Sequence, residues 1–245
     1  MQQFLSGHKA LVTGGSKGIG LEIARALAAS GADVVICSRS EASLDKAITQ
    51  LTSNPTGEQL AGKVIGQVAD VSSSVAVSRL FEFVDREFGS LDILINNAGS
   101  GVFRPVGELT VEEWDRTIGT NLSGAFYCSR EAVRRFRTKG GWIINISSLA
   151  GKNPFAGGAA YNASKFGLNG FSEALMLDHR HDNVRVSYIM PGSVDTEFSG
   201  HMPAEKSEWK IAPEDVAEIA LDILRKPPRT LVSRVEVRPS RPPKK

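Results

Sequence analysis

The chain has few cysteines and no long apolar run, and both shortages narrow the class of protein. Its 245 residues include two cysteines, Cys37 and Cys128. Neither lies in a metal-ligand spacing, so we expect no metal site, and two isolated thiols favour a reducing compartment. No apolar run approaches the ~20 residues with which a helix spans a bilayer, so we expect no membrane partner.

The net charge is small, which argues against a nucleic-acid partner. The formal charge is +2, although residues 225–245 hold eight basic residues and one acid, Glu236. The segment 238–245 is basic and rich in proline. It could alternatively bind nucleic acid or an acidic surface, in a way that weakens steeply with salt. The start, Met1-Gln2-Gln3-Phe4, lacks the charged segment and apolar core of a signal peptide, so we expect a cytoplasmic location.

Short apolar runs alternate with amphipathic segments along the chain. We expect strands at 9–13, 33–37, 63–69, 91–95, 141–146, 184–190 and 230–237. We expect helices at about 18–30, 41–53, 73–88, 111–137, 159–181 and 213–225. This alternation predicts right-handed βαβ units, and therefore an α/β fold whose parallel sheet is covered by helices on both faces. No repeat or linker divides the chain, so we expect one domain over 1–237, followed by a tail over 238–245.

The most informative stretch contains a tyrosine and a lysine four residues apart. On a helix, Tyr161 and Lys165 share one face. An ammonium lowers the pKa of a nearby phenol, so the pair predicts a tuned acid and base. Ser148 follows the apolar run 142–146, at the carboxyl end of an expected strand, where open α/β sheets bind ligands. Tyr-x-x-x-Lys alone also occurs on ordinary surface helices, so the other motifs must support it.

A glycine-rich turn joins the first expected strand to the first helix. Gly14, Gly18 and Gly20 follow the pattern Thr-Gly-x-x-x-Gly-x-Gly. Glycines let the backbone approach a pyrophosphate that lies at the helix N-terminus, so we predict a dinucleotide site. At the end of the second strand, Ser38 and Arg39 stand where an NAD site has an acid. Together with Lys17 they favour the 2′-phosphate of NADP, the alternative being solvated surface charges.

Polar residues follow the next strands as well. Asp70 could accept a hydrogen bond from an adenine amine or could only cap the helix that follows. Asn97 and Gly99, in Asn-Asn-Ala-Gly, could brace neighbouring loops and let a ribose approach. Asn121 stands in the middle of an expected helix, where asparagine is a poor residue. It either packs or holds a water beside Lys165.

Together these residues resemble the short-chain dehydrogenase/reductase family over roughly residues 8–225. The resemblance rests on the glycine turn, Asn96-Asn97-Ala98-Gly99, Asn121, Ser148, Tyr161-x-x-x-Lys165 and Pro191-Gly192. It implies a single Rossmann domain with a doubly wound seven-stranded sheet, and a nicotinamide cofactor. It implies that Tyr161 is the acid/base and that Ser148 binds the substrate oxygen. It also implies that Lys165 lowers the tyrosine pKa and holds the ribose, and that Asn121 supports a proton relay. The full set of expected cofactor-binding residues is Gly14, Ser16, Lys17, Gly18, Ile19, Gly20, Ser38, Arg39, Asp70, Val71, Asn97, Ala98, Gly99, Tyr161, Lys165, Pro191, Gly192, Val194 and Thr196.

The expected reaction passes a hydride between the nicotinamide of NADP(H) and a carbonyl or secondary alcohol, with ketone or aldehyde reduction favoured. Residues that could meet the small-molecule substrate are Phe103, Phe155, Met190, Phe198, His201, Met202 and Trp209. Many family members that reduce 3-oxoacyl thioesters end in a Gly-Gly segment that supports a tetramer, whereas this chain ends in the different segment 233–239. A thioester reductase and a non-catalytic dinucleotide sensor remain alternatives. The resemblance implies a homodimer or homotetramer built on helices 111–137 and 159–181.

Overall fold

Seven parallel strands form one sheet in the order β3-β2-β1-β4-β5-β6-β7. The computed structural model describes residues 3–53, 60–136, 139–198 and 208–243. The strands are β1 (Lys9–Thr13), β2 (Asp33–Ser38), β3 (Val64–Val68), β4 (Ile93–Asn96), β5 (Gly141–Ile146), β6 (Val184–Pro191) and β7 (Arg234–Val237). Every neighbouring pair is parallel. The expected seven-stranded parallel sheet is therefore confirmed.

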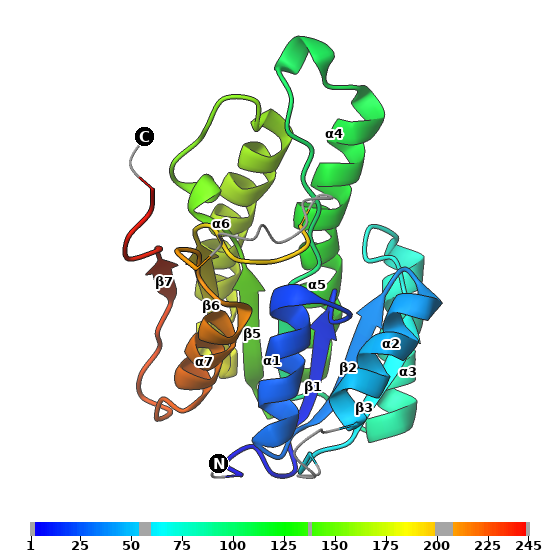
Figure 1. Cartoon of the computed structure of the whole chain (residues 1–245). Helices are drawn as coiled ribbons and strands as arrows, with labels where there is room; N and C mark the ends of the chain where they lie inside the picture. Colours follow the sequence, from blue (N-terminus) through cyan, green and yellow to red (C-terminus); the bar gives the residue numbers. More distant parts are fainter. Residues whose placement is uncertain (1–2, 54–59, 137–138, 199–207, 244–245) are drawn as a thin grey trace.

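Helices cover both faces of this sheet (Figure 1). The helices are α1 (Gly18–Ala29), α2 (Glu41–Thr52), α3 (Ser74–Phe88), α4 (Val111–Ile118), α5 (Gly124–Phe136), α6 (Ala159–His179) and α7 (Pro213–Leu224). One buried cluster joins α1, α2 and α7 to the sheet, and a second joins α3, α5 and α6 to its other face. Because both faces are covered, the central strands read as continuous apolar runs; all four residues of β4 are buried.

Capping residues fix helix starts that the sequence predicted. Thr110 and Glu113 form a reciprocal capping box at α4. Asp215 accepts the Ala212 N–H at 3.0 Å at the start of α7, where Pro213 occupies the first turn. These contacts satisfy N–H groups that a helix leaves unpaired at its N-terminus.

Two expected elements differ in the structure. The single helix expected at 111–137 is α4 and α5 joined by a π-helical turn, η2 (Gly119–Ser123). The strand expected at 230–237 begins only at Arg234, because Thr230 still belongs to a turn in which its N–H bonds the Pro227 carbonyl at 2.9 Å. Within the described residues, no helix is long and apolar enough to cross a membrane.

Candidate active site

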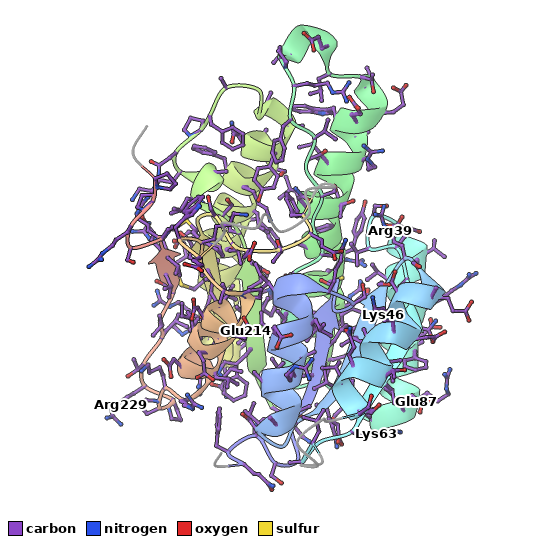
Figure 2. All side chains as sticks on the ribbon, viewed as in Figure 1. Arg39, Lys46, Lys63, Glu87, Glu214 and Arg229 are labelled. Carbon is purple, nitrogen blue, oxygen red and sulfur yellow. The ribbon has the colours of Figure 1, made fainter. Side chains whose placement is uncertain are left out.

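A cavity of about 1340 Å³ lies at the carboxyl ends of the strands. The strand arrows point to this side of the sheet in Figure 1. Figure 2 labels Arg39, which follows β2, on that side, and Lys63, which precedes β3, at the opposite end. All the residues expected to bind cofactor line the cavity except Gly20, and so does Ser148. The cavity is therefore where an open α/β sheet binds its ligand.

The glycine turn between β1 and α1 forms one wall of the cavity. Gly14 and Gly18 have φ of +63° and +54°, a region that favours glycine. A Cβ on Gly14 would lie 2.8 Å from the Ala98 Cα, so the turn packs closely on the segment after β4. Gly20 does not line the cavity; its missing Cβ instead admits the Asn97 amide and the Gly14 carbonyl.

The N-terminus of α1 faces the cavity without a side-chain cap. Its N-cap residue, Lys17, makes no capping hydrogen bond, and the first turn has no acid. Such a terminus presents unpaired N–H groups and a positive dipole end, which suit a pyrophosphate. The residues present therefore fit a dinucleotide cofactor.

Asn97 and Thr13 hold the glycine turn in place. The Asn97 Nδ2 donates to the carbonyl oxygens of Thr13 and Gly14, both at 3.0 Å. The Thr13 hydroxyl oxygen accepts the N–H groups of Asn97 and Ala98 at 3.0 and 3.1 Å. The bracing role expected for the amide after β4 is thus confirmed.

The end of the cavity next to β2 carries hydroxyl and guanidinium groups. Ser38 and the exposed Arg39 line it, and so do Ser40 and Ser43, which the sequence analysis missed. Ser40 caps α2 by accepting the Ser43 N–H at 3.3 Å. The sequence feature that could have identified these two residues is a serine helix cap directly after β2. Lys17 lies 3.7 Å from Glu197, and both side chains are more than half exposed.

Asp70 does not cap α3, so that alternative is wrong. The cap is Ser73, whose hydroxyl accepts the Ala76 N–H at 3.3 Å. The Asp70 carboxylate instead accepts the N–H and hydroxyl of Ser72 at 2.9 and 2.8 Å. This bond fixes the turn after β3, with Asp70 on the cavity wall.

Tyr161, Lys165 and Ser148 meet on one wall of the cavity. The Ser148 side chain acts on the Tyr161 hydroxyl and favours its ionised form. The Lys165 Nζ lies 5.7 Å from the centre of the tyrosine ring and donates to the Ile146 carbonyl at 2.9 Å. Ser148 follows β5 and the other two lie on α6, as the sequence predicts.

Burial shifts two pKa values in this group. It raises the pKa of Tyr161 above its ordinary value of 10.0, although the Ser148 side chain acts in the opposite direction. Lys165 is not among the causes of this shift, so its expected lowering of the tyrosine pKa stays a prediction. Burial also lowers the pKa of Lys165 to about 8, because an ammonium is poorly solvated there. Desolvation is thus the largest cause of both shifts.

Asn121 lies behind the wall rather than on it. It is 2% exposed and does not line the cavity. Its Nδ2 donates to the Ser100 carbonyl at 2.8 Å and to the Ser164 hydroxyl at 2.9 Å, and its Oδ1 accepts the Ser100 N–H at 2.8 Å. Both amide donors are therefore used by protein groups. The proton-relay role of Asn121 stays a prediction.

The rest of the lining includes aromatic residues and the C-terminal segment. Phe103, Phe155, Phe198 and Trp209 line the cavity as hypothesised, whereas Met190 is buried and does not. His201 and Met202 lie outside the described residues. The cavity is also lined by Arg238, Pro239 and Pro242, which were not expected from the sequence. They are held there because the Gly192 N–H donates to the Val237 carbonyl at 2.8 Å.

Comparison with known proteins agrees with this architecture. A family model described as short chain dehydrogenase matches residues 8–207. The 3β-hydroxysteroid dehydrogenase of Mediterraneibacter gnavus is 35% identical over 196 residues, which cover 80% of this chain and 69% of that protein. The 3-oxoacyl-[acyl-carrier-protein] reductase FabG of Chlamydia muridarum is 36% identical over 232 residues, covering 90% and 91% of the two chains. This chain therefore belongs to the short-chain dehydrogenase family.

A solved structure shares the whole fold. It is a metagenomic short-chain oxidoreductase in complex with NADP, 37% identical, with a TM-score of 0.83 over 97% of this chain and 99% of that one. The doubly wound fold expected from the resemblance is thus confirmed.

Proposed function

We propose that this protein is an NADP(H)-dependent oxidoreductase that interconverts a carbonyl group and a secondary or primary alcohol, with ketone or aldehyde reduction as its main direction. The observation that carries the proposal is the convergence of Ser148, Tyr161 and Lys165 on one cavity wall. An acid/base and a hydroxyl donor at one point suit the transfer of a proton to a carbonyl oxygen.

The nicotinamide, when bound, supplies the hydride that reduces the carbonyl carbon. The Ser148 hydroxyl donates a hydrogen bond to the carbonyl oxygen and stabilises the charge that grows there. The Tyr161 hydroxyl gives its proton to that oxygen, which completes the alcohol. Because burial raises the tyrosine pKa, the phenol keeps its proton near neutral pH and serves as an acid. The Lys165 Nζ, held by the Ile146 carbonyl, stands beside the ring and stabilises the phenolate left behind.

The end of the cavity at β2 supports NADP(H) over NAD(H). Arg39 presents a planar fork of donors that suits a phosphate, and Lys17 adds a second cation. Ser38 and Ser43 line the same end and bring no negative charge that would repel an anion. The solved short-chain oxidoreductase bound to NADP is consistent with this choice.

The decisive experiment is replacement of the acid alone. In Tyr161→Phe the ring remains and the proton donor is lost, so we expect kcat for carbonyl reduction to fall about 10²- to 10⁴-fold. The dissociation constant for NADPH, measured by calorimetry, should stay nearly unchanged. Tyr127→Phe is the matched control, because this tyrosine of α5 does not line the cavity. Reduction by Tyr161→Phe at the rate of the unchanged protein would disprove the assignment.

Two further features of the structure bear on cellular location and on oligomeric state. The free thiols of Cys37 and Cys128 are both buried, which supports the proposed cytoplasmic, reducing location. Large apolar side chains of α4, α5 and α6 reach the surface, which supports a homodimer or homotetramer built on these helices.

A further inference from the structure

Three phenylalanines from separate parts of the chain form one group, and two of them contact the Tyr161 ring. Phe103 follows β4, Phe155 precedes α6, and Phe198 follows β6. The Phe103 ring lies 5.6 Å from that of Tyr161 and 5.7 Å from that of Phe155, measured between centroids. The Phe198 ring lies 5.7 Å from that of Tyr161 and 6.5 Å from that of Phe103. These separations are those of favourable aromatic contacts.

The rings face the cavity rather than the core. Phe103 and Phe155 are 40% and 46% exposed, whereas the core residues Phe81 and Phe136 are fully buried. All three phenylalanines of the group line the cavity together with Ser148. An apolar surface beside an acid/base remains in water until an apolar ligand covers it.

Contacts within the protein hold two of these rings in position. Asn162 follows Tyr161 directly on α6, and its Nδ2 donates to the Phe155 carbonyl at 3.0 Å. The Phe155 ring lies against Gly158, where a Cβ would approach it to 2.6 Å. Phe103 follows Ser100, whose backbone is bonded twice to Asn121. The aromatic surface is thus preorganised, which lowers the entropic cost of binding.

Three cations, two in the cavity lining and one next to Phe103 in the sequence, already have partners. Arg104 lies 3.0 Å from Glu113, Lys210 lies 3.4 Å from Asp195, and Arg238 lies 2.9 Å from Glu236. A ligand anion would have to compete with these carboxylates. The surroundings therefore favour a neutral ligand.

We propose that Phe103, Phe155 and Phe198 form an aromatic subsite that selects neutral carbonyl compounds with an aromatic ring next to the reacting carbonyl. This proposal rests on the proposed function and names its substrate class. Stacked or edge-to-face contacts place the ring, and the carbonyl oxygen then reaches Ser148 and Tyr161.

The test compares acetophenone with 2-octanone, which has as many carbons and no ring, under NADPH. We expect kcat/KM to be at least about tenfold higher for acetophenone, because ring-to-ring contacts add to simple burial. In the double variant Phe103→Leu, Phe198→Leu this ratio should fall close to one, while the NADPH dissociation constant stays the same. Phe83→Leu, on α3 and outside the cavity lining, should keep the original ratio.

Two results would overturn the proposal: a ratio near one in the unchanged protein, or a ratio unaffected by the double variant. Faster reduction of the anionic 4-acetylbenzoate than of acetophenone would overturn the preference for neutral compounds. Binding separates this proposal from the reaction itself. Ligand-observed NMR should show that acetophenone binds Tyr161→Phe, and that this binding weakens when Phe103 and Phe198 are also replaced by leucine. If no ketone is reduced but acetophenone still binds in this way, the proposed function fails and the subsite stands. If acetophenone binds Tyr161→Phe no better than it binds the variant that also carries the two leucines, or does not bind at all, the subsite is overturned.

Discussion

The side-chain amide of Asn121 donates a 2.9 Å hydrogen bond to the hydroxyl of Ser164, directly before Lys165 on α6. The Ser164 hydroxyl in turn donates to the Tyr161 carbonyl at 2.8 Å. The same amide holds the Ser100 backbone after β4. One buried side chain therefore joins η2, the cavity wall after β4, and the helix that carries the acid/base.

Replacement of Asn121 by alanine should weaken both the fold and the reaction. The change leaves the Ser100 backbone groups without these partners in a buried place, which costs about 1–3 kcal/mol in the free energy of unfolding. We expect kcat to fall as well, because α6 loses a contact that positions Tyr161. Urea unfolding and steady-state kinetics measure the two effects.

A double-mutant cycle with Ser164→Ala isolates the contact between the two residues. Its coupling energy should be about 0.5–1.5 kcal/mol, as for a neutral buried hydrogen bond. Additive effects of the two substitutions on stability would contradict the brace. Full stability of Asn121→Ala combined with lost turnover would instead favour the proton-relay role.

The buried lysine should make stability depend on pH. Below pH about 8 both the folded and the unfolded chain hold the proton of Lys165, and the folded state carries the desolvation cost. Between about 8 and 10.5 the folded state has released the proton and the unfolded chain still binds it. The contribution of Lys165 to the free energy of unfolding therefore rises with pH in this window, by up to about 1.4 kcal/mol per pH unit.

Lys165→Met supplies the comparison, because it removes the titration and keeps an apolar stem. Urea unfolding of both proteins between pH about 8 and about 10 should show the stability of the unchanged protein gaining on that of the variant. Parallel pH profiles would show that Lys165 titrates near its ordinary pKa. The upper limit avoids the range in which the Tyr161 phenol ionises, since its pKa is raised above 10.0.

Cofactor choice should depend on the residues after β2. Charge-assisted contacts contribute roughly 1.5–3 kcal/mol each, so Arg39 and Lys17, discounted for exposure, predict about hundredfold tighter binding of NADPH than of NADH. Ser38→Asp combined with Arg39→Ala should reverse this preference, because the new carboxylate repels a 2′-phosphate and accepts a ribose hydroxyl. Dissociation constants at one salt concentration measure it. Lys46→Ala is the control, because this cation of α2 (Figure 2) is exposed and lies outside the cavity lining, so it should leave the preference unchanged. Equal affinity of the unchanged protein for NADH and NADPH would refute the assignment.

Assembly should depend on the exposed apolar residues of α4, α5 and α6. Trp114, Phe126, Phe166 and Leu177 are 40%, 45%, 45% and 56% exposed. We expect at least a homodimer in light scattering, and Phe126→Asp should shift the mass toward the 26.3 kDa monomer by placing a charge in the interface. Val75→Asp on α3, where the valine is 61% exposed, is the control and should not change the mass. A monomer at micromolar concentration for the unchanged protein would contradict the expectation.

Local sequence signals sufficed for most of the fold and for the reacting group. The buried strands are β-branched runs, the helix starts carry caps, and Tyr161 and Lys165 are placed together by helical periodicity alone. The π-helical turn η2 was not predictable, because one extra residue in a turn shifts the apolar pattern at a single point and keeps the helical period on either side. The one sequence signal for η2 was Asn121, because asparagine is a poor helix residue and here stands within a helical stretch.

Other parts of the site depend on tertiary contacts that no local pattern encodes. The gathering of Phe103, Phe155 and Phe198 requires three loops to meet above one edge of the sheet. The effect of burial on the Tyr161 pKa was missed for the same reason, since spacing reveals the neighbouring lysine but not the depth of burial. The reach of Arg238 and Pro242 into the cavity lining depends on the pairing of β7 with β6.

That pairing has a consequence for how the site is made during synthesis. The glycine turn leaves the ribosome well before the segment after β7, yet both line one cavity. Gly192 gains its hydrogen bond to Val237 only after β7 has emerged and paired. A nascent chain that already contains Tyr161 and Lys165 therefore still lacks one side of its pocket, and ligand recognition matures only once β7 and the segment after it have emerged.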